Sequence, residues 1–273
     1  MLFEKIAIPP DDILGNIFLA LEKISKDVKK GLLRRSFIRE KEKGDVTYEF
    51  DIYIEKKFVD AIRDIGLEIP VLGEETTYNG EGDEFILIDP IDGSTNAQKN
   101  LPFFAIVLAY VKGKKFLDIQ NAVVWDIPHE RIYFASKGRG AFITDVTGTK
   151  KIDVTLLRKE AMVESLIDIT PASPLESIKK IQKYGKLRHL GSLGLSICYV
   201  CEGALDVAAD ISGRARMVDV AAPIFILKEA RGFYLLEPEE PVKPDTNVVY
   251  IVTWRKDIYE SVKSEVWPLR KKL

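Results

Sequence analysis

The chain has 273 residues, 46% of them hydrophobic, and its 40 Lys and Arg residues nearly balance 42 Asp and Glu residues. A chain of this length can bury a large core, either as one domain or as two tightly packed halves. The formal net charge of −2 gives no electrostatic footprint for nucleic acid or a membrane surface, and no apolar stretch approaches the ~20 residues that span a bilayer. Because the N-terminus also lacks a signal-peptide core, we expect a cytoplasmic protein.

The N-terminal segment predicts two packing helices separated by a charged hairpin. Asp11 or Asp12 can cap the first helix, whose apolar face consists of Ile13, Leu14, Ile17, Phe18, Leu21, Ile24 and Val28. The charged residues 34–43 suit a solvated hairpin or a mobile flap. The second helix spans roughly residues 52–65, with Asp51 at its start.

The following residues predict a β-rich region and then an alternating one. Strand-like runs lie at residues 69–72, 85–88, 103–111, 121–125 and 131–135, and turns at Gly113 and at residues 138–140. From about Lys151 onward, strands at 162–168, 187–190 and 204–209 alternate with helices at 174–184, 193–202 and from Asp219 to near Gly232. Such alternation predicts a mixed or parallel sheet with helices on its faces.

The stretch around Asp89 and Asp92 is the most informative part of the chain. An apolar strand runs into Asp-Pro-Ile-Asp, and Pro90 is expected to force the chain out of the sheet directly after Asp89, so that the two carboxylates converge. Gly93-Ser94-Thr95 then offers N–H groups and hydroxyls where a helix could begin, an arrangement that holds phosphate. For this segment alone, an ordinary turn and helix cap explain the residues equally well.

Further carboxylates at element ends favour a metal site. Glu74 and Glu75 follow one apolar run, and Asp219 opens an apolar helical stretch. Carboxylates gathered at ~4 Å repel by roughly 4 kcal/mol per pair at an effective dielectric of 20, so such a cluster needs cations. Oxygen-only ligands favour magnesium or manganese.

Three motifs, in this order, resemble the signatures of the inositol monophosphatase and fructose-1,6-bisphosphatase superfamily. They are Gly73-Glu74-Glu75, Asp89-Pro90-Ile91-Asp92-Gly93-Ser94 and Asp219-Val220-Ala221-Ala222. The segment Gly44-Asp45-Val46-Thr47 with Asp51 and Glu55 resembles the mobile loop and first catalytic aspartate of the family, and Gly191-Ser192-Leu193-Gly194 through Asp206 resembles its sugar-side segment. The pattern is closest to the archaeal branch, whose members often act on both substrates.

Two departures from the family pattern are visible. Many members have a tryptophan before the last metal aspartate, whereas Met217-Val218 precede Asp219 here. The spacing from Thr47 to Asp51 is also one residue longer than in the animal inositol phosphatases. Neither departure removes a ligand, and Asp51 keeps the catalytic assignment.

The resemblance implies an α+β fold, a layered α-β-α-β-α sandwich. Residues 1–150 would form an N-terminal α+β half with an antiparallel sheet and most metal ligands. Residues 151–273 would form a C-terminal α/β half with the sugar-side residues and the last metal aspartate. Relatives commonly form homodimers and are inhibited by lithium, so both properties are expected.

The resemblance also implies residue roles. Glu74, Asp89 and the carbonyl of Ile91 would bind one ion, and Asp89, Asp92 and Asp219 a second, with two or three Mg²⁺ in all and Mn²⁺ as a substitute. Water activated on the metal would then attack the phosphate without a phosphoenzyme. Glu74 or Asp51, with a hydroxyl from Ser94 or Thr47, would orient and deprotonate that water. The N–H groups of Gly93 and Ser94 would hold the phosphate.

Recognition of the leaving group is expected from the C-terminal half, together with Asp92. By resemblance, Ser192 and Leu193 lie on the sugar side, and Asp210 matches a position that accepts polyol hydroxyls, although a turn at a strand end explains Asp210 nearly as well. A guanidinium can grip a second phosphate with two parallel bonds. The candidates are Arg188, Arg214 and Arg216, for each of which a surface role is at least as good an interpretation.

Three functions are therefore weighed. The favoured one is a Mg²⁺-dependent phosphate monoester hydrolase acting on inositol monophosphate, fructose 1,6-bisphosphate or both. A 3′-phosphoadenosine 5′-phosphate phosphatase would use the same metal signatures, and a non-catalytic partner of the transcription machinery is the third.

The cysteines and histidines are expected to be structural. Cys198 and Cys201 lie in an apolar helical segment, so we predict buried thiols; a disulfide stays a minor alternative. His129 is predicted to occupy a surface turn. His189 stands near Gly191, where a structural role is favoured over one at the substrate.

Overall fold

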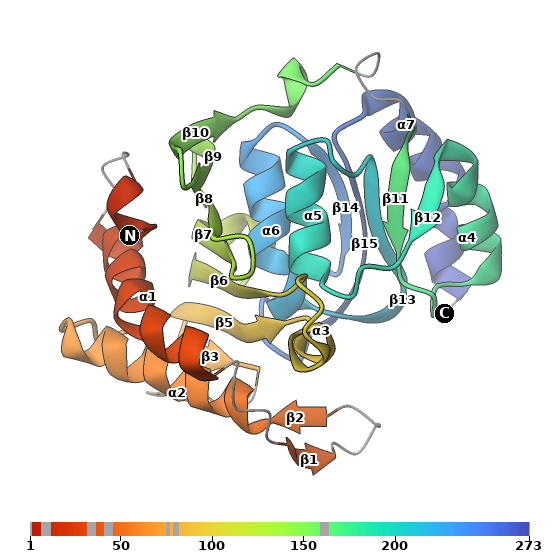
Figure 1. Cartoon of the computed structure of the whole chain (residues 1–273). Helices are drawn as coiled ribbons and strands as arrows, with labels where there is room; N and C mark the ends of the chain where they lie inside the picture. The colour runs from red at the N-terminus through yellow and green to blue at the C-terminus, as the bar shows by residue number, and fades with distance from the viewer. Residues whose placement is uncertain are drawn as a thin grey trace.

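The computed structural model describes residues 2–6, 12–31, 37–40, 46–74, 77–78, 82–158 and 164–272 (Figure 1). Its α-helices are α1 (Asp12–Gly31), α2 (Glu49–Asp64), α3 (Ser94–Lys99), α4 (Leu175–Ile181), α5 (Leu193–Cys201), α6 (Met217–Glu229) and α7 (Lys256–Glu265). The strands of the N-terminal region are β1 (Phe37–Glu40), β2 (Val46–Tyr48), β3 (Val71–Gly73), β4 (Thr77–Tyr78), β5 (Glu84–Asp92), β6 (Ala105–Lys112), β7 (Ile119–Asp126), β8 (Arg131–Ser136), β9 (Gly140–Asp145) and β10 (Gly148–Ile152). Those of the C-terminal region are β11 (Leu166–Ile169), β12 (Lys186–Arg188), β13 (Val207–Arg216), β14 (Phe233–Glu237) and β15 (Asn247–Thr253).

Two large sheets organise the molecule. The first has eight strands in the order β10-β9-β8-β7-β6-β5-β3-β4, and its pairs are antiparallel except for the parallel pair β3 and β5. The second has the order β12-β11-β13-β15-β14 and is mixed, since β11 runs parallel to β12 and β13 whereas β15 is antiparallel to β13 and β14. The predicted antiparallel first sheet and mixed second sheet are therefore both present.

Three apolar cores separate five layers. One core joins α1 and α2 to one face of the first sheet, and includes Leu14, Ile17, Phe58 and Ile86. The central core joins the other face of that sheet to α5, α6 and the second sheet. The third packs α7 and Ile181 at the end of α4 against the far face of the second sheet. Figure 1 shows the resulting α-β-α-β-α order, so the predicted fold class is confirmed.

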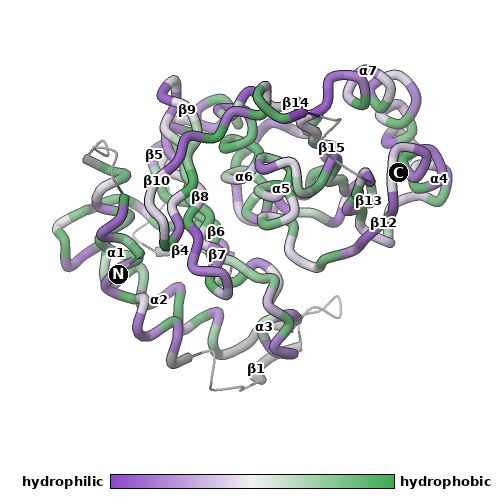
Figure 2. Tube along the Cα trace, turned by 45° about the horizontal axis from the view of Figure 1, so that its top comes forward, coloured by the Kyte–Doolittle hydropathy of each residue, from purple (hydrophilic) through white to green (hydrophobic). Residues whose placement is uncertain are grey.

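The sequences of the helices fit their layers. The outer helix α1 buries one stripe of residues, Leu14, Ile17, Leu21, Ile24 and Val28, because apolar residues recur every three or four positions. By contrast, α6 is apolar all round and is buried from Met217 to Leu227. Figure 2 shows the same difference, with hydrophobic segments gathered around α5 and α6 and alternating ones along α1 and α2.

The expectation that the chain leaves the sheet after Asp89 is wrong. Strand β5 continues to Asp92, which pairs with Ala105 of β6, and the register shifts between Asp89 and Asp92. A bulge at this point explains how Pro90 is accommodated, because a bulge leaves a residue without a ladder partner and proline has no N–H to donate. The bulge also re-aims the side chains on either side of it.

Other elements differ from the sequence expectation in their bounds. Helix α6 begins at Met217, two residues before Asp219, and β13 extends to Arg216 instead of ending at Ala209. Strands β9 and β10, which follow the expected turn at residues 138–140, were not predicted. The C-terminal β14, β15 and α7 were not predicted at all. The division into halves at residue 150 stays a prediction, since the central core includes residues of both parts.

Cys198 and Cys201 are free and buried on α5, as predicted. His129 lies in the turn between β7 and β8, and its Nδ1 is 2.9 Å from the buried carboxylate of Asp126. Among the helices of the described residues, none is long and apolar enough to cross a membrane.

Removing a large side chain beneath α2 tests how this helix is held on the sheet. Phe58 is fully buried in the first core, whereas Tyr53 on the same helix is 41% exposed. We expect Phe58→Ala to lower the free energy of unfolding by about 3–5 kcal/mol, because it removes buried area and leaves a cavity. Tyr53→Ala should cost less than about 1 kcal/mol. Urea unfolding of both variants measures the difference, and equal losses would contradict this account of the core.

Candidate active site

Carboxylates gather where β3 ends beside the bulge of β5. The two strands are parallel, with Gly73 opposite Ile88, so Glu74 and Asp89 follow at the same edge. The N–H of Glu74 donates to the carbonyl of Ile88 at 3.1 Å, which fixes the start of the Glu74 loop. The pairing of β3 with β5 therefore makes two of the predicted ligands, Glu74 and Asp89, neighbours.

Asp89 is buried among other acids. Its side chain is only 2% exposed, and its Oδ1 accepts the N–H of Ile91 at 2.9 Å. Burial is the main cause of a pKa well above the usual range, and the charges of Glu74, Asp219 and Asp92 raise it further. The other three carboxylates are therefore within electrostatic reach of Asp89.

Asp92 is held by the first turn of α5. Its carboxylate accepts hydrogen bonds from the Ser192 hydroxyl, from Leu193 N–H at 3.1 Å and from Gly194 N–H at 2.7 Å. The helix N-terminus favours a negative charge at this position. Burial nevertheless raises the pKa of Asp92 to about 7, against the lowering effect of these donors. The predicted sugar-side residues Ser192 and Leu193 thus contact a predicted metal ligand.

Asp219 lies in the first turn of α6 and is joined to Arg216. One carboxylate oxygen, Oδ2, accepts the Arg216 N–H at 3.1 Å, and Oδ1 accepts from the Arg216 Nη2 at 3.1 Å. The Nη1 of the same guanidinium donates to Glu74 Oε1 at 2.7 Å. Burial disfavours the charge of Arg216, but Asp219 and Glu74 outweigh it and raise the pKa of the guanidinium. The sequence did not predict this bridge.

The first two turns of α2 have two buried carboxylates, one of which lies against Gly73. Asp51 is 5% exposed and Glu55, one turn later, is fully buried. A Cβ on Gly73 would lie 2.1 Å from the Glu55 carboxyl carbon, so a larger residue there would force the Glu55 side chain to move. Thr47 belongs to β2, but its side chain lies outside the described residues, as do Gly44, Asp45 and Glu75.

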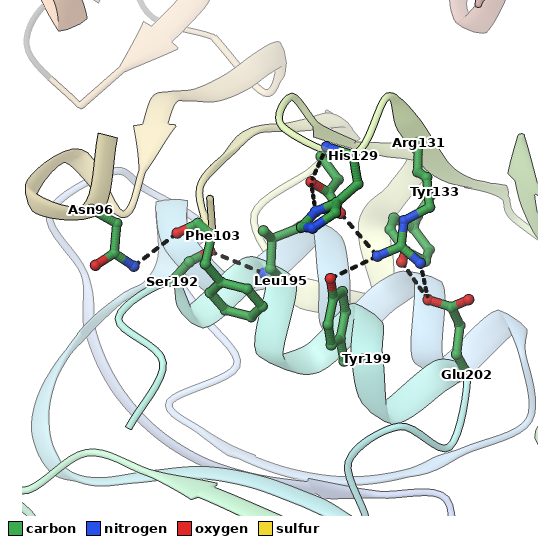
Figure 3. A network of polar contacts seen from close by, with 10 residues as sticks. Asn96, Phe103, His129, Arg131, Tyr133, Ser192, Leu195, Tyr199 and Glu202 are labelled. Atoms are coloured by element: carbon green, nitrogen blue, oxygen red, sulfur yellow. Dashed lines mark hydrogen bonds and ion pairs between the residues drawn. The ribbon is translucent and has the colours of Figure 1, made fainter. Parts of the chain in front are cut away.

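The proposed phosphate-holding turn sits against the C-terminal half. Gly93 has φ 88°, and an added Cβ would lie about 3 Å from the carbonyls of Phe103 and Gly191, so glycine is required on both counts. Ser94 opens α3 directly after it. The Asn96 amide donates to the carbonyl of Phe103 at 2.8 Å (Figure 3). It also donates to the carbonyl of Leu190 at 2.7 Å, which ties α3 to the segment before α5. Nothing in the sequence singled out Asn96.

A second polar network fixes the other end of α5. Arg131, at the start of β8, donates to Asp126 at 3.1 Å, to Glu202 at 3.1 Å and to the Tyr199 hydroxyl at 2.7 Å (Figure 3). Tyr133 also donates to Glu202. The helix that holds Asp92 is thereby clamped to the first sheet at both ends.

The remaining sugar-side residues lie on the second sheet. Asp210 is buried near the irregularity of β13, where its Oδ1 accepts the Ser212 N–H at 2.7 Å and the Ser212 hydroxyl at 2.6 Å. Arg214 is exposed in the same irregular stretch. Arg188, at the end of β12, is exposed and donates to the Leu187 carbonyl at 2.8 Å. His189 lies beside Asp168, with 4.0 Å between Nδ1 and Oδ1.

The donor set fits a hard divalent cation. Glu74, Asp89, Asp92 and Asp219 offer only oxygen atoms, the ligands that Mg²⁺ and Mn²⁺ prefer. Burial and then the neighbouring negative charges raise the pKa of Asp89, and a cation would neutralise those charges. As the side chains stand, however, no three His, Cys, Asp or Glu residues of the described chain form a group that could hold a metal ion. Arg216 and the α5 N-terminus already bind part of the set.

The sequence matches a known family over nearly its whole length. The inositol monophosphatase family model matches residues 13–268. A fructose-1,6-bisphosphatase/inositol-1-monophosphatase of Thermococcus kodakarensis is 31% identical over 81% of this chain and 85% of its own length. A protein of the same name from Methanocaldococcus jannaschii is 29% identical over 75% of this chain and 77% of its own. A bifunctional NADP phosphatase/NAD kinase of Methanococcus maripaludis is 27% identical over 75% of this chain but only 39% of its own length.

Solved structures share the fold. An inositol monophosphatase-fructose 1,6-bisphosphatase named MJ0109 aligns with a TM-score of 0.72 at 25% identity, covering 89% of this chain and 96% of its own. An IMPase/NADP phosphatase complexed with Mg²⁺ and phosphate aligns with a TM-score of 0.73 at 18% identity, covering 90% and 93%.

The elevated pKa of Asp92 predicts how the metal-free protein responds to pH. Because the folded state holds this carboxyl with a pKa of about 7, above the ordinary value of about 4, protonation favours folding. The resulting stability is present at low pH and is lost as the pH rises from about 4 to about 7. In EDTA, wild type should therefore lose more unfolding free energy between pH 5 and pH 8 than Asp92→Asn.

Urea unfolding at both pH values measures this difference. Added Mg²⁺ should restore the wild type at pH 8 and have less effect on the variant. The same pH dependence in both proteins would show that Asp92 does not titrate in this range.

Proposed function

Because this chain belongs to the inositol monophosphatase family, we propose that it is a Mg²⁺-dependent phosphatase that hydrolyses inositol monophosphate, fructose 1,6-bisphosphate or both. The observation that carries the proposal is a set of contacts at the seam, the place where the end of β3 and the bulge of β5 meet the first turns of α5 and α6. Glu74 lies next to Asp89 by strand pairing, Asp92 binds the start of α5, and Arg216 bridges Glu74 and Asp219. A cluster of buried carboxylates is costly without a cation, and a phosphate ester supplies further negative charge that the same cation would attract.

The metal ligands are proposed residue by residue. Glu74, Asp89 and the carbonyl of Ile91 would hold one ion, and Asp89, Asp92 and Asp219 a second. When bound there, Mg²⁺ or Mn²⁺ would neutralise charge on the phosphoryl oxygens and lower the pKa of a bound water. In support, Asp89 stands next to Glu74 by strand pairing, and Ile91 is buried in the bulge between Asp89 and Asp92.

The protein groups around the phosphate have separate proposed tasks. Gly93 and Ser94 N–H groups, at the first turn of α3, would donate to phosphate oxygens, because that turn lacks intrahelical acceptors for them. Asp51 or Glu74, with a hydroxyl of Ser94 or Thr47, would orient the attacking water and accept its proton. In support, Asp51 is a buried carboxylate in the first turn of α2.

The leaving group would lie on the C-terminal side of the seam. Asp92, Ser192, Leu193 and Asp210 are proposed to face the sugar or polyol hydroxyls, and Arg188 and Arg214 are exposed enough to reach a second phosphate. Arg216 is instead engaged with two carboxylates. A homodimer is likewise proposed from the family.

A nucleotide phosphatase is the second candidate. Two archaeal relatives are named bifunctional NADP phosphatase/NAD kinase, at 27% and 26% identity. A cavity of about 590 Å³ borders Glu74 and is lined also by Phe85, Lys114 and Lys243. This volume accommodates a sugar bisphosphate as well as a nucleotide, so the cavity does not choose between the candidates. A non-catalytic partner of the transcription machinery remains the alternative if hydrolysis is absent.

A substrate panel tests the proposal. With Mg²⁺, purified protein should release phosphate from inositol 1-phosphate, from fructose 1,6-bisphosphate or from both, faster than from 3′-phosphoadenosine 5′-phosphate or NADP. Asp92→Asn should lower kcat by about a hundredfold or more, roughly 2.7 kcal/mol in activation free energy, because a shared charge is lost. Asp60→Asn, an exposed position on α2, is the matched control and should retain wild-type kcat.

The other results of the panel are equally informative. Preference for either nucleotide would move the function to the second candidate. No Mg²⁺-dependent release from any substrate would leave the non-catalytic role, tested by capture of RNA polymerase. Near-normal kcat in Asp92→Asn would remove Asp92 from the machinery.

The second-phosphate assignment has its own test. Arg188→Ala and Arg214→Ala should each reduce kcat/KM for fructose 1,6-bisphosphate about tenfold more than for inositol 1-phosphate, since only the bisphosphate carries the extra anionic group. Arg231→Ala, which removes an exposed arginine paired with Asp153, should alter neither substrate. Equal losses on both substrates would exclude the two arginines from second-phosphate recognition.

A further inference from the structure

We infer that Arg216 is a built-in counter-cation of the carboxylate cluster, which competes with a divalent metal ion for Glu74 and Asp219. Metal binding would then require the guanidinium to leave the cluster. The inference rests on the proposed metal site, and it adds a residue that sets metal affinity without being a ligand.

The geometry supports competition because Arg216 takes atoms that the metal would need. Both carboxylate oxygens of Asp219 accept from Arg216, one from its backbone N–H and one from its guanidinium. The other arm of the guanidinium binds Glu74 Oε1 at 2.7 Å. The fork therefore spans two proposed ligands that come from different halves of the chain.

The main chain of Arg216 is fixed, but its side chain has room to move. Arg216 pairs with Asn247 of β15, and the next N–H, of Met217, donates to the Thr246 carbonyl at 2.8 Å. The side chain is 32% exposed, compared with 15% for Glu74 and 10% for Asp219. Rotation about side-chain bonds can thus release the guanidinium to solvent without breaking the sheet.

Charge explains why the cluster needs such a residue. The charge of Arg216 also reaches Asp89, whose pKa it lowers against the raising effects of burial and of the other acids. Without a cation, Glu74, Asp89 and Asp219 would repel one another inside the seam. A divalent ion placed among the same carboxylates would in turn repel the nearby guanidinium. The two cations therefore exclude each other, and Arg216 keeps the metal-free seam together.

The test is Mn²⁺ binding without substrate, measured by isothermal titration calorimetry on the full chain. Arg216→Met removes the charge and keeps the length of the side chain, and should lower the Kd of Mn²⁺ about tenfold or more. In EDTA this variant should have a lower Tm than wild type, and Mn²⁺ should raise its Tm by more. Arg231→Met, which removes the charge of an exposed arginine paired with Asp153, should match wild type in both measurements, because an exposed ion pair contributes little to stability.

A second substitution covers a failure of Arg216→Met to fold in EDTA. Arg216→Lys keeps the charge but loses the fork, so it should bind Mn²⁺ more tightly than wild type by a smaller factor, about threefold. Unchanged or weaker Mn²⁺ binding by the folded variants would overturn the inference and show that Arg216 positions the ligands instead. Absence of Mn²⁺ binding by wild type would overturn the proposed metal site itself, and the inference with it.

Discussion

The mutual repulsion of buried carboxylates is the constraint on which this structure depends. Asp89, Asp92 and Asp219 are all buried, and they come from β5 of the first sheet and from α6, which packs against that sheet in the central core. Taking even one such charge out of water is expensive unless hydrogen bonds or opposite charges compensate for it. Each of these carboxylates is compensated by different hydrogen-bond partners. Asp92 receives three donors from the start of α5, Asp219 receives Arg216, and Asp89 accepts from the Ile91 N–H within its own bulge.

These hydrogen bonds and ion pairs also hold the N-terminal and C-terminal regions of the chain together. The donors to Asp92 belong to α5, and Arg216 reaches from the end of β13 to Glu74 in the first sheet. Asn96 adds a link from α3 to the Leu190 carbonyl. Hydrogen bonds to ionised groups are stronger than neutral ones, so the charges that chemistry would use also stabilise the seam. Loss of one carboxylate should consequently alter both the site and the contact between the sheets.

The sequence could single out the members of the cluster because each lies in a short, local motif. Glu74 follows an apolar strand, Asp89 and Asp92 flank Pro-Ile, and Asp219 opens an apolar helix, and the family resemblance assembled these motifs into one place. The path of the backbone at Pro90 was harder to predict. Pro90 indicates a break only if the strand is regular, and whether a bulge absorbs it depends on the neighbouring strand β6. Strand β15 could have been found, since residues 247–253 form an apolar run rich in β-branched residues.

Partnerships across the fold were beyond the reach of the sequence. Arg216 stood out only as one of three arginines suited to a phosphate, because nothing local shows that its guanidinium meets Glu74, 142 residues earlier. Asn96 and the link between Arg131 and Glu202 likewise depend on how α5 packs against the first sheet. Local patterns reveal which residues carry charge, whereas the tertiary fold decides which charge neutralises which.

The proposed hydrolytic centre and the proposed leaving-group side are built from different parts of the fold. The carboxylate cluster and the turn at Gly93 belong to buried elements, chiefly β5 and α6, and to the residues that directly follow them. Every phosphate monoester would place the same phosphate group there. The leaving group would instead meet side chains at the ends of β12 and in the irregular part of β13, where Arg188 and Arg214 are exposed. Exposed side chains are weakly constrained by packing, so related chains can change them without loss of the fold. Substrate preference can therefore diverge among relatives that share one hydrolytic centre.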